Sequence, residues 1–154
     1  MSELIFRDAT AGDLPAIVAM LADDGLGGGR ETVLAEGVDP VYATAFEAVS
    51  GQAGNRVIVA EQDGALVGTY QFIVIPGLSH RGTTRAQIEA VRVAKDLRGH
   101  GIGEAMLRHA VEEAKAKGCG LVQLTSSKRR GRAHTFYERL GFVATHIGFK
   151  LELK

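Results

Sequence analysis

The chain has 154 residues, which is enough for one domain with a sizeable buried core, and we expect residues 1–154 to form that single domain. Its 18 Lys and Arg residues balance 18 Asp and Glu residues, so charge points to neither nucleic acid nor a membrane surface as a partner. No apolar run approaches the roughly 20 residues of a transmembrane helix, and no signal-peptide pattern is evident. The lone Cys119 excludes an internal disulfide and a cysteine-rich metal site, so we expect a cytoplasmic protein without a metal.

The first predicted elements are a strand over 4–7 and the helix that follows it. Thr10 or Asp13 can cap this helix, and Pro15 favours a start close to Asp13 because proline is tolerated only in the first turn. An apolar stripe predicts that one side of the helix is buried. The stripe consists of Leu14, Ile17, Val18 and Leu21.

A glycine-rich stretch with several acidic residues follows over 22–39. This composition predicts a loop, with a short helix near 31–36. Such a loop suits closure over a small molecule better than the binding of an extended chain. A second helix is expected over 40–50.

Two strands over 56–62 and 65–75 are expected to pair. They are separated by Asp63-Gly64, a strong hairpin signal because both residue types tolerate positive φ. A polar loop over 78–83 then leads into a strand over 84–93. The sequence thus predicts an antiparallel hairpin and, after it, a strand that ends at a glycine-rich turn.

This turn carries one arginine and three glycines and opens a helix. Glycine lets the backbone approach a ligand closely, and the unpaired N–H groups of a helix start carry a partial positive charge. Together they predict an anion cradle, most often for phosphate, in which Arg98 adds a forked cation suited to a pyrophosphate. The pattern is neither a Walker A loop nor the dinucleotide fingerprint. The residues of this anion cradle are Arg98, Gly99, His100, Gly101, Ile102 and Gly103.

The last third of the chain begins with a helix over 102–117 and an apolar strand over 120–125, which we expect to be central in the sheet. A basic loop leads to a helix over 132–140, and a final hairpin pairs 142–145 with 149–153. Strands and helices alternate in part, which predicts an α/β fold with a mixed sheet and helices on both faces.

Two segments resemble the GNAT superfamily of N-acetyltransferases. Val-x-Val followed by Arg-x-x-Gly-x-Gly, over 91–103, is similar to the acyl-coenzyme-A (CoA) motif of that family. The stretch over 133–142 resembles the family's C-terminal helix and the strand after it, at about the usual separation. The resemblance implies a GNAT-type mixed, mostly antiparallel central sheet and acetyl-CoA as the acyl donor. It also implies that the strands ending at Val93 and Thr125 splay apart to take the pantetheine arm.

The same resemblance implies how the cofactor is held. The backbones of Val91 and Val93 would pair with the pantetheine like an extra strand, and the N–H of Val93 would donate to the thioester oxygen. Arg130 stands where many family members carry an Asn that pairs with the pantetheine, and we expect it to contact the cofactor. It belongs to a basic cluster that is either a solvated loop or a contact for cofactor phosphates or an anionic acceptor. The cluster consists of Lys128, Arg129, Arg130 and Arg132.

Two residues are candidates for proton transfer. Tyr137 lies on an apolar helical stripe and could be a core residue, but its position matches the family's frequent general acid, which protonates the leaving thiolate. Glu89 shares a strand face with Val91 and Val93 if the alternation is unbroken, and could deprotonate the amine directly or through a water. The alternative for Glu89 is a solvated side chain or a structural ion pair.

We therefore expect an acetyl-CoA-dependent N-acetyltransferase that acts on a primary amine of a small molecule by direct attack. Cys119 lies at the wrong end of its strand to form a covalent intermediate. The alternatives are acetylation of a protein or peptide N-terminus and a non-catalytic acyl-CoA-binding regulatory module. Ala-His-x-Phe-Tyr, followed by Thr145-His146 and Phe149-Lys150, resembles a bacterial subgroup that includes aminoalkylphosphonate acetyltransferases. Family habit adds a homodimer through the C-terminal hairpin as an expectation, and the identity of the amine stays open.

Overall fold

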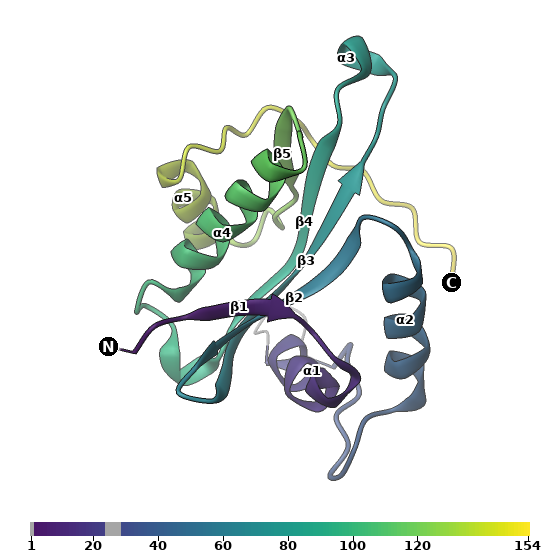
Figure 1. The fold of residues 1–154 in the computed structure, drawn as a ribbon, viewed down its shortest axis with the longest axis vertical. Coiled ribbons are helices and arrows are strands. Elements are labelled where there is room, and N and C mark those ends of the chain that lie inside the picture. Colours follow the sequence, from purple (N-terminus) through teal and green to yellow (C-terminus); the bar gives the residue numbers. More distant parts are fainter. Residues whose placement is uncertain (1, 24–28) are drawn as a thin grey trace. The chain divides into compact units, whose positions relative to one another are not determined.

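A five-stranded sheet organises the fold, with its strands in the order β1-β2-β3-β4-β5 (Figure 1). The computed structural model describes residues 2–23 and 29–154, in two compact units, Met1–Gln123 and Leu124–Lys154. Strands β1 to β4 are antiparallel neighbours, and β5 runs parallel to β4, since Gly120 N donates to Thr84 O and Gln123 contacts Gln87. The strands are β1 (Ile5–Asp8), β2 (Asn55–Gln62), β3 (Ala65–Ile75), β4 (Arg85–Val93) and β5 (Leu121–Leu124).

The helices of the first unit are α1 (Leu14–Ala22), α2 (Pro40–Gly51), the short α3 (Ser79–Gly82) and α4 (Ile102–Ala116), and the second unit contains α5 (Gly131–Arg139). Helices α1, α2 and α4 lie where the sequence predicted them, and α3 lies in a segment predicted to be a loop. Short 3₁₀ turns precede α1 (Ala11–Asp13) and α4 (Lys95–Leu97). Within residues 2–23 and 29–154, no helix is both long enough and apolar enough to cross a membrane.

The start of α1 is fixed by hydrogen bonds to the carboxylate of Asp13. The backbone N–H of Thr10 donates to Asp13 Oδ2 (2.7 Å), so the two alternative cap residues act together, and Pro15 lies in the first turn as expected. The guanidinium of Arg7 donates to both Asp13 oxygens (2.7 and 3.0 Å) and also to Glu61 (2.6 Å). The hydrogen bonds from Arg7 lower the pKa of Asp13 to about 2.

Helices cover both faces of the sheet. On one face α4 packs against β3 and β4, and a Cβ added at Gly68 would lie only 2.6 Å from Met106 Sδ, so this glycine permits the close approach. On the other face Thr69 is buried where α1 packs against β3 and β4, while α2 lies against β2 and α1 (Figure 1). The apolar core comprises Leu14, Ile17, Val18, Met20, Ile58, Val59, Ala60, Val67, Tyr70, Phe72, Ala86, Ile88, Ile102, Met106, Leu107, Ala110 and Ala114.

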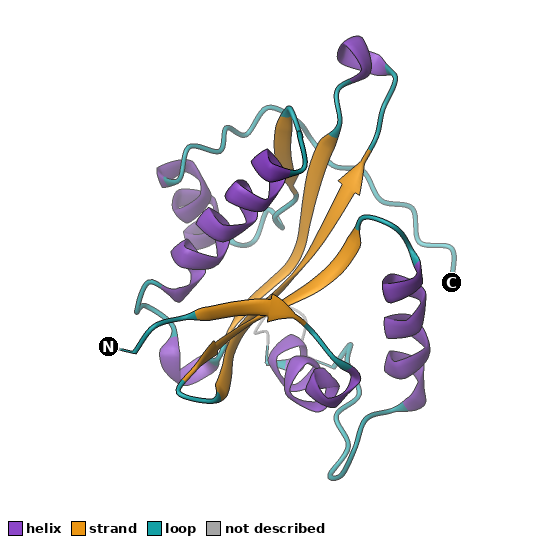
Figure 2. Cartoon of the chain, in the orientation of Figure 1, coloured by secondary structure: helices purple, strands orange, loops and turns teal. Residues whose placement is uncertain are grey.

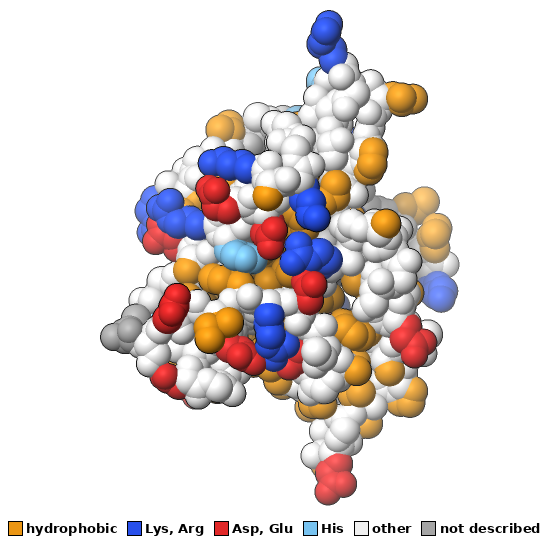
Figure 3. All heavy atoms as spheres, in the orientation of Figure 1, with side chains coloured by type: hydrophobic (Ala, Val, Ile, Leu, Met, Phe, Trp, Pro, Cys, Tyr) orange, Lys and Arg blue, Asp and Glu red, His pale blue; other side chains and the backbone are white. Residues whose placement is uncertain are grey.

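A polar network at the edge of this core holds α4 to three strands. The hydroxyl of Tyr70 lies 2.7 Å from Nδ1 of His109, and burial lowers the pKa of this histidine. Arg56 bridges Glu113 of α4 (3.4 Å) and Asp8 of β1 (2.8 Å). On the face shown in Figure 3, Lys and Arg side chains are interleaved with Asp and Glu over α4 and β1, as the zero net charge predicts.

Three sequence predictions are wrong. The expected helix near 31–36 does not form, and Thr32 N instead donates to the hydroxyl of Tyr42 (2.8 Å). β5 is an edge strand of the described sheet, not a central one. The final hairpin over 142–145 and 149–153 is also absent, and Figure 2 shows this segment as loop to the end of the chain. Two strands of four or five residues are marginal by themselves, because an isolated hairpin buries too little surface to be stable in water.

Candidate active site

The glycine turn predicted before α4 is present, and anion binding by the residues of the anion cradle stays a prediction. Gly99 and Gly101 both have φ of +83°, a left-handed conformation that favours glycine. The N-cap residue, Gly101, has no side chain to cap the helix, and the first hydrogen bond of the helix runs from Ala105 N to Gly101 O (3.1 Å). The amides of Ile102 and Gly103 are therefore without intrahelical acceptors. A Cβ added at Gly99 or Gly101 would meet nothing within 4 Å, so the turn that leads into these amides has open space around it.

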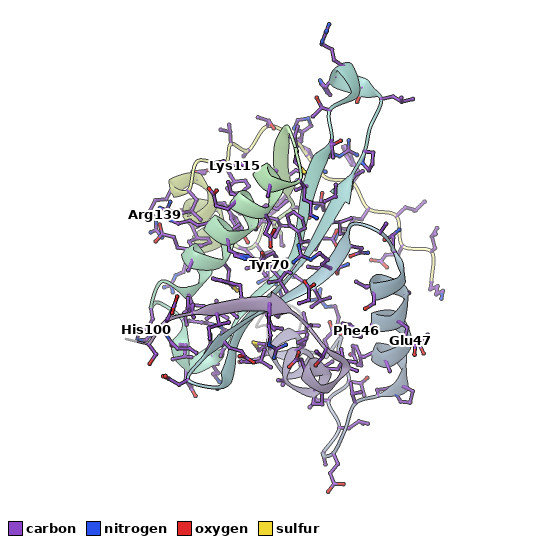
Figure 4. The ribbon with its side chains drawn as sticks, in the orientation of Figure 1. Phe46, Glu47, Tyr70, His100, Lys115 and Arg139 are labelled. Atoms are coloured by element: carbon purple, nitrogen blue, oxygen red, sulfur yellow. The ribbon has the colours of Figure 1, made fainter. Side chains whose placement is uncertain are left out.

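His100 folds back onto the turn. Its Nδ1 lies 3.2 Å from the carbonyl oxygen of Leu97 and 3.1 Å from that of Arg98, so the Nδ1–H tautomer donates to these two acceptors. Figure 4 shows His100 at the outer end of the turn. These contacts stabilise the turn and engage carbonyl oxygens, which would otherwise repel an anion.

Arg98 connects the cradle to two other elements. Its Nη2 donates to the carbonyl oxygen of Asp23, directly after α1 (2.8 Å), and lies 3.6 Å from the Asp23 carboxylate. Its Nε donates to the carbonyl oxygen of Val93, the last residue of β4 (3.3 Å). The sequence did not indicate Asp23 as a partner, because the two residues are 75 positions apart. Arg98 thus ties the cradle to the C-terminal end of α1.

A β-bulge interrupts β4 next to Glu89. In the register with β3, Thr69 faces Arg92 and Gln71 faces Glu89, so two residues of β4 lie opposite one residue of β3. Ala90 in the bulge has φ of +53°, which is uncommon for a residue other than glycine. The alternation is therefore broken.

The bulge corrects the expected orientation of Glu89. Val93 pairs with Gly68, and Gly68 lies on the face covered by α4. Glu89 pairs with Gln71, which lies on the opposite face because β3 alternates without interruption there. Glu89 and Val93 consequently lie on different faces of the sheet, contrary to the prediction from simple alternation.

The outer edge of β4 is unpaired over its second half. β5 accompanies the first half only, since Gly120 N donates to Thr84 O (2.8 Å) and β5 ends at Leu124. Beyond Ile88, none of the described strands pairs with this edge. Ala94 N donates to Val67 O of β3 (2.9 Å), so the N–H of the preceding residue, Val93, points to the open edge. By the same alternation Val91 belongs to this edge, and a ligand could pair there as an additional strand.

Glu89 is exposed on the face opposite α4. Among residues 2–23 and 29–154 it takes part in no salt bridge, so the structural ion pair that the sequence left open does not form there. An unpaired carboxylate beside a bulge can accept a proton or hold an ammonium group.

Tyr137 belongs to the second unit, where it is half-buried in α5. Its ring makes edge contacts with Phe136 (5.3 Å between centroids) and Phe142 (6.0 Å). Arg130 is the N-cap residue of α5, and His134 Nε2 lies 2.7 Å from a carbonyl oxygen in the preceding loop. Tyr137 thus contacts two aromatic residues of its own unit, and a role in proton transfer stays a prediction.

The remaining candidates for chemistry are a metal site and the thiol of Cys119. Within the described residues no group of three or more His, Cys, Asp or Glu could hold a metal ion. Cys119 is half-buried, and burial raises the pKa of its thiol, which disfavours the nucleophilic thiolate.

Comparison with known proteins agrees with this geometry. The chain is 42% identical to the crystal structure of a transcriptional regulator from Bacillus halodurans C-125, with a TM-score of 0.93 and coverage of 98% of this chain and 100% of that one. It is 34% identical to an aminoalkylphosphonate N-acetyltransferase from Salmonella typhimurium, over 46% of each chain. It is 32% identical to a streptothricin acetyltransferase from Streptomyces lavendulae, over 84% of this chain and 58% of the relative. The chain thus spans about half the length of these two relatives.

The model of the Acetyltransferase (GNAT) family matches residues 30–142, which include β4, the anion cradle and α5. The described sheet, mostly antiparallel with one parallel pair and with helices on both faces, is the fold that this family resemblance implied. The chain belongs to the Acetyltransferase (GNAT) family.

Proposed function

We propose that this chain, as one acetyltransferase domain over residues 1–154, transfers an acetyl group from acetyl-CoA to a primary amine of a small molecule. The observation that carries the proposal is the combination of a glycine N-cap at the start of α4 with an edge of β4 at Val93 that none of the described strands pairs with. The cradle suits the pyrophosphate, and the edge suits the amide groups of pantetheine, which pair like a strand.

The reaction is a direct acyl transfer. The amine nitrogen forms a bond to the thioester carbonyl carbon, the carbon–sulfur bond breaks, the amine loses a proton and the thiolate gains one. In this proposal the N–H of Val93 stabilises the developing negative charge on the carbonyl oxygen. Glu89 accepts the proton of the amine, directly or through a water, and Tyr137 protonates the thiolate. Arg130 contacts the cofactor.

The names of the relatives support a small acceptor. The Salmonella and Streptomyces relatives are named for aminoalkylphosphonate and streptothricin, which are both small molecules. The Bacillus halodurans protein is instead called a transcriptional regulator, which favours a non-catalytic acyl-CoA-binding module as the second candidate. A catalysed release of the CoA thiol in the presence of an amine separates the two candidates.

The test of the mechanism is Tyr137→Phe, with Tyr70→Phe as the matched control. Thiol release from acetyl-CoA is measured with several amines, and acetyl-CoA affinity by calorimetry. Loss of a general acid should lower kcat by about 10²–10⁴-fold while affinity hardly changes. Tyr70 has a hydroxyl contact with His109 (2.7 Å) and no proposed role in the reaction, so Tyr70→Phe should keep kcat. Full turnover by a folded Tyr137→Phe protein would make Tyr137 a packing residue.

A further inference from the structure

A row of carboxamide side chains crosses the sheet beside Glu89, on the face opposite α4. We call it the amide row. Gln71 lies directly across from Glu89 in the β3–β4 register, and Gln87 lies two residues before Glu89 on the same face. All four side chains of the row are half-buried. The amide row consists of Asn55 of β2, Gln71 of β3, Gln87 of β4 and Gln123 of β5.

Hydrogen bonds join the row in two pairs. Gln71 Nε2 donates to Asn55 Oδ1 (2.9 Å), and Gln123 Nε2 donates to Gln87 Oε1 (2.7 Å). Asn55 Nδ2 in turn donates to Gln52 Oε1 (2.7 Å). These bonds fix the orientation of each carboxamide, because one end of each group is committed to a neighbour.

The other ends of the carboxamides are available. A carboxamide has two N–H donors and an oxygen acceptor, so one hydrogen bond leaves most of its capacity unused. Within the described residues, Gln71 Oε1, Gln87 Nε2 and Gln123 Oε1 make no hydrogen bond. None of them is among the fully buried polar atoms without a partner, so each of the three atoms keeps some exposed surface. Glu89 is therefore flanked by a fixed acceptor on Gln71 and a fixed donor on Gln87.

This arrangement suits an acceptor that carries hydrogen-bonding groups next to its amine. The carboxylate of Glu89 and Gln71 Oε1 can accept hydrogen bonds from an amino group, while Gln87 Nε2 and Gln123 Oε1 can donate to and accept from a hydroxyl or amide next to it. An alkyl or aryl amine would leave these half-buried groups without partners, which is costly. We propose that the acceptor is an amine with neighbouring hydroxyl or amide groups, such as an amino sugar, and that Gln71 and Gln87 select it. This inference rests on the proposed acetyl transfer.

Two arginines on the same face represent the competing chemistry. Arg85 and Arg92 lie at the two ends of β4, on the face of Glu89, because their partners in β3 are Ile75 and Thr69. The guanidinium of Arg92 donates to the backbone oxygen of Val91 (3.0 Å). An acceptor with an anionic group would bind to these arginines instead of the amide row. The test therefore includes an anionic amine.

The experiment compares ring amines with and without hydroxyl groups. The values of kcat/KM per unprotonated amine are measured for glucosamine, cyclohexylamine and aminomethylphosphonate. The wild-type protein should prefer glucosamine, and Gln71→Leu and Gln87→Leu should each reduce its preference over cyclohexylamine by about 10- to 100-fold. Gln62→Leu is the matched control, because the Gln62 side chain donates to the backbone oxygen of Ser2 (2.8 Å), away from Glu89, and it should keep the preference.

The outcomes are distinct for the two proposals. Failure of the wild-type protein to release CoA thiol with any amine would overturn the proposed acetyl transfer and, with it, the selectivity. Turnover without a preference for glucosamine, a preference for aminomethylphosphonate, or an unchanged preference in both Leu variants would overturn the role of the amide row alone. If Gln87→Leu does not fold, Gln87→Met removes the same donor with a flexible side chain of similar length and decides the question.

Discussion

Substitution of Gly101 by alanine tests the anion cradle with little disturbance elsewhere. Gly101 is the N-cap residue of α4 with φ of +83° and ψ of +3°, and an added Cβ would meet nothing within 4 Å. The substitution therefore introduces no steric clash, and its cost is the left-handed backbone, about 1–2 kcal/mol. If CoA binds only to the left-handed turn, its affinity should fall by roughly 5- to 30-fold, because 1.4 kcal/mol corresponds to a factor of ten.

The assay is calorimetric titration with CoA, together with thermal unfolding of each variant. Gly118→Ala is the matched control, because Gly118 has φ of +75° at the other end of α4 and also has open space around it. It should destabilise the protein, yet leave CoA affinity within about twofold, because the strain is of the same kind but lies away from the amides. Gly101→Asn should recover part of the affinity, since asparagine tolerates the left-handed conformation.

The two glycines make the result decisive. If Gly118→Ala lowers the melting temperature as expected and Gly101→Ala binds CoA as tightly as the wild-type protein, the start of α4 does not hold the pyrophosphate. Equal losses of affinity in both variants would instead mean that α4 as a whole, and not its N-terminal turn, controls binding.

Three further predictions concern charge and packing. Arg98→Ala should weaken CoA by about 1.5–3 kcal/mol more than it weakens a truncated pantetheine, and equal losses in calorimetry would show that Arg98 only positions the turn. Asp13→Asn should reduce the free energy of unfolding by about 2 kcal/mol at pH 7, since its carboxyl pKa is lowered to about 2. Urea titrations should show this difference shrinking below about pH 4 and vanishing near pH 2, because the wild-type protein loses the contribution as Asp13 is protonated. Gly68→Ala should destabilise by about 1–3 kcal/mol against Met106 Sδ, and combination with Met106→Ala should be less damaging than the sum of the two changes.

Predictions that depended on a residue's own backbone preference were accurate. Asp63-Gly64 predicted the β2–β3 hairpin, and both residues have positive φ, +53° and +79°. Gly99 and Gly101 predicted a tight turn before a helix, and both are left-handed. These preferences arise within one residue, so they do not require knowledge of the surrounding fold.

Predictions that depended on which strands lie side by side in the sheet were less reliable. The apolar strand over 120–125 was expected to be central, yet β5 is an edge strand and Leu121 is 41% exposed. The alternating residues after Phe142 predicted strands, but no strand of the described chain pairs with them. Alternation indicates which side chains share a face, but it does not supply the neighbouring strand that the backbone hydrogen bonds need.

The sequence by itself determined the first four strands, the helices α1, α2 and α4, the glycine turn at the start of α4 and the family of the chain. Only the tertiary structure decided the face on which Glu89 lies, the contact between Arg98 and Asp23, and the assembly of the amide row from four strands. Each of these depends on register between segments far apart in sequence. A single extra residue at Ala90, of a type that does not signal a bulge, moves Glu89 to the other face of the sheet, because side chains in a strand alternate with a period of two.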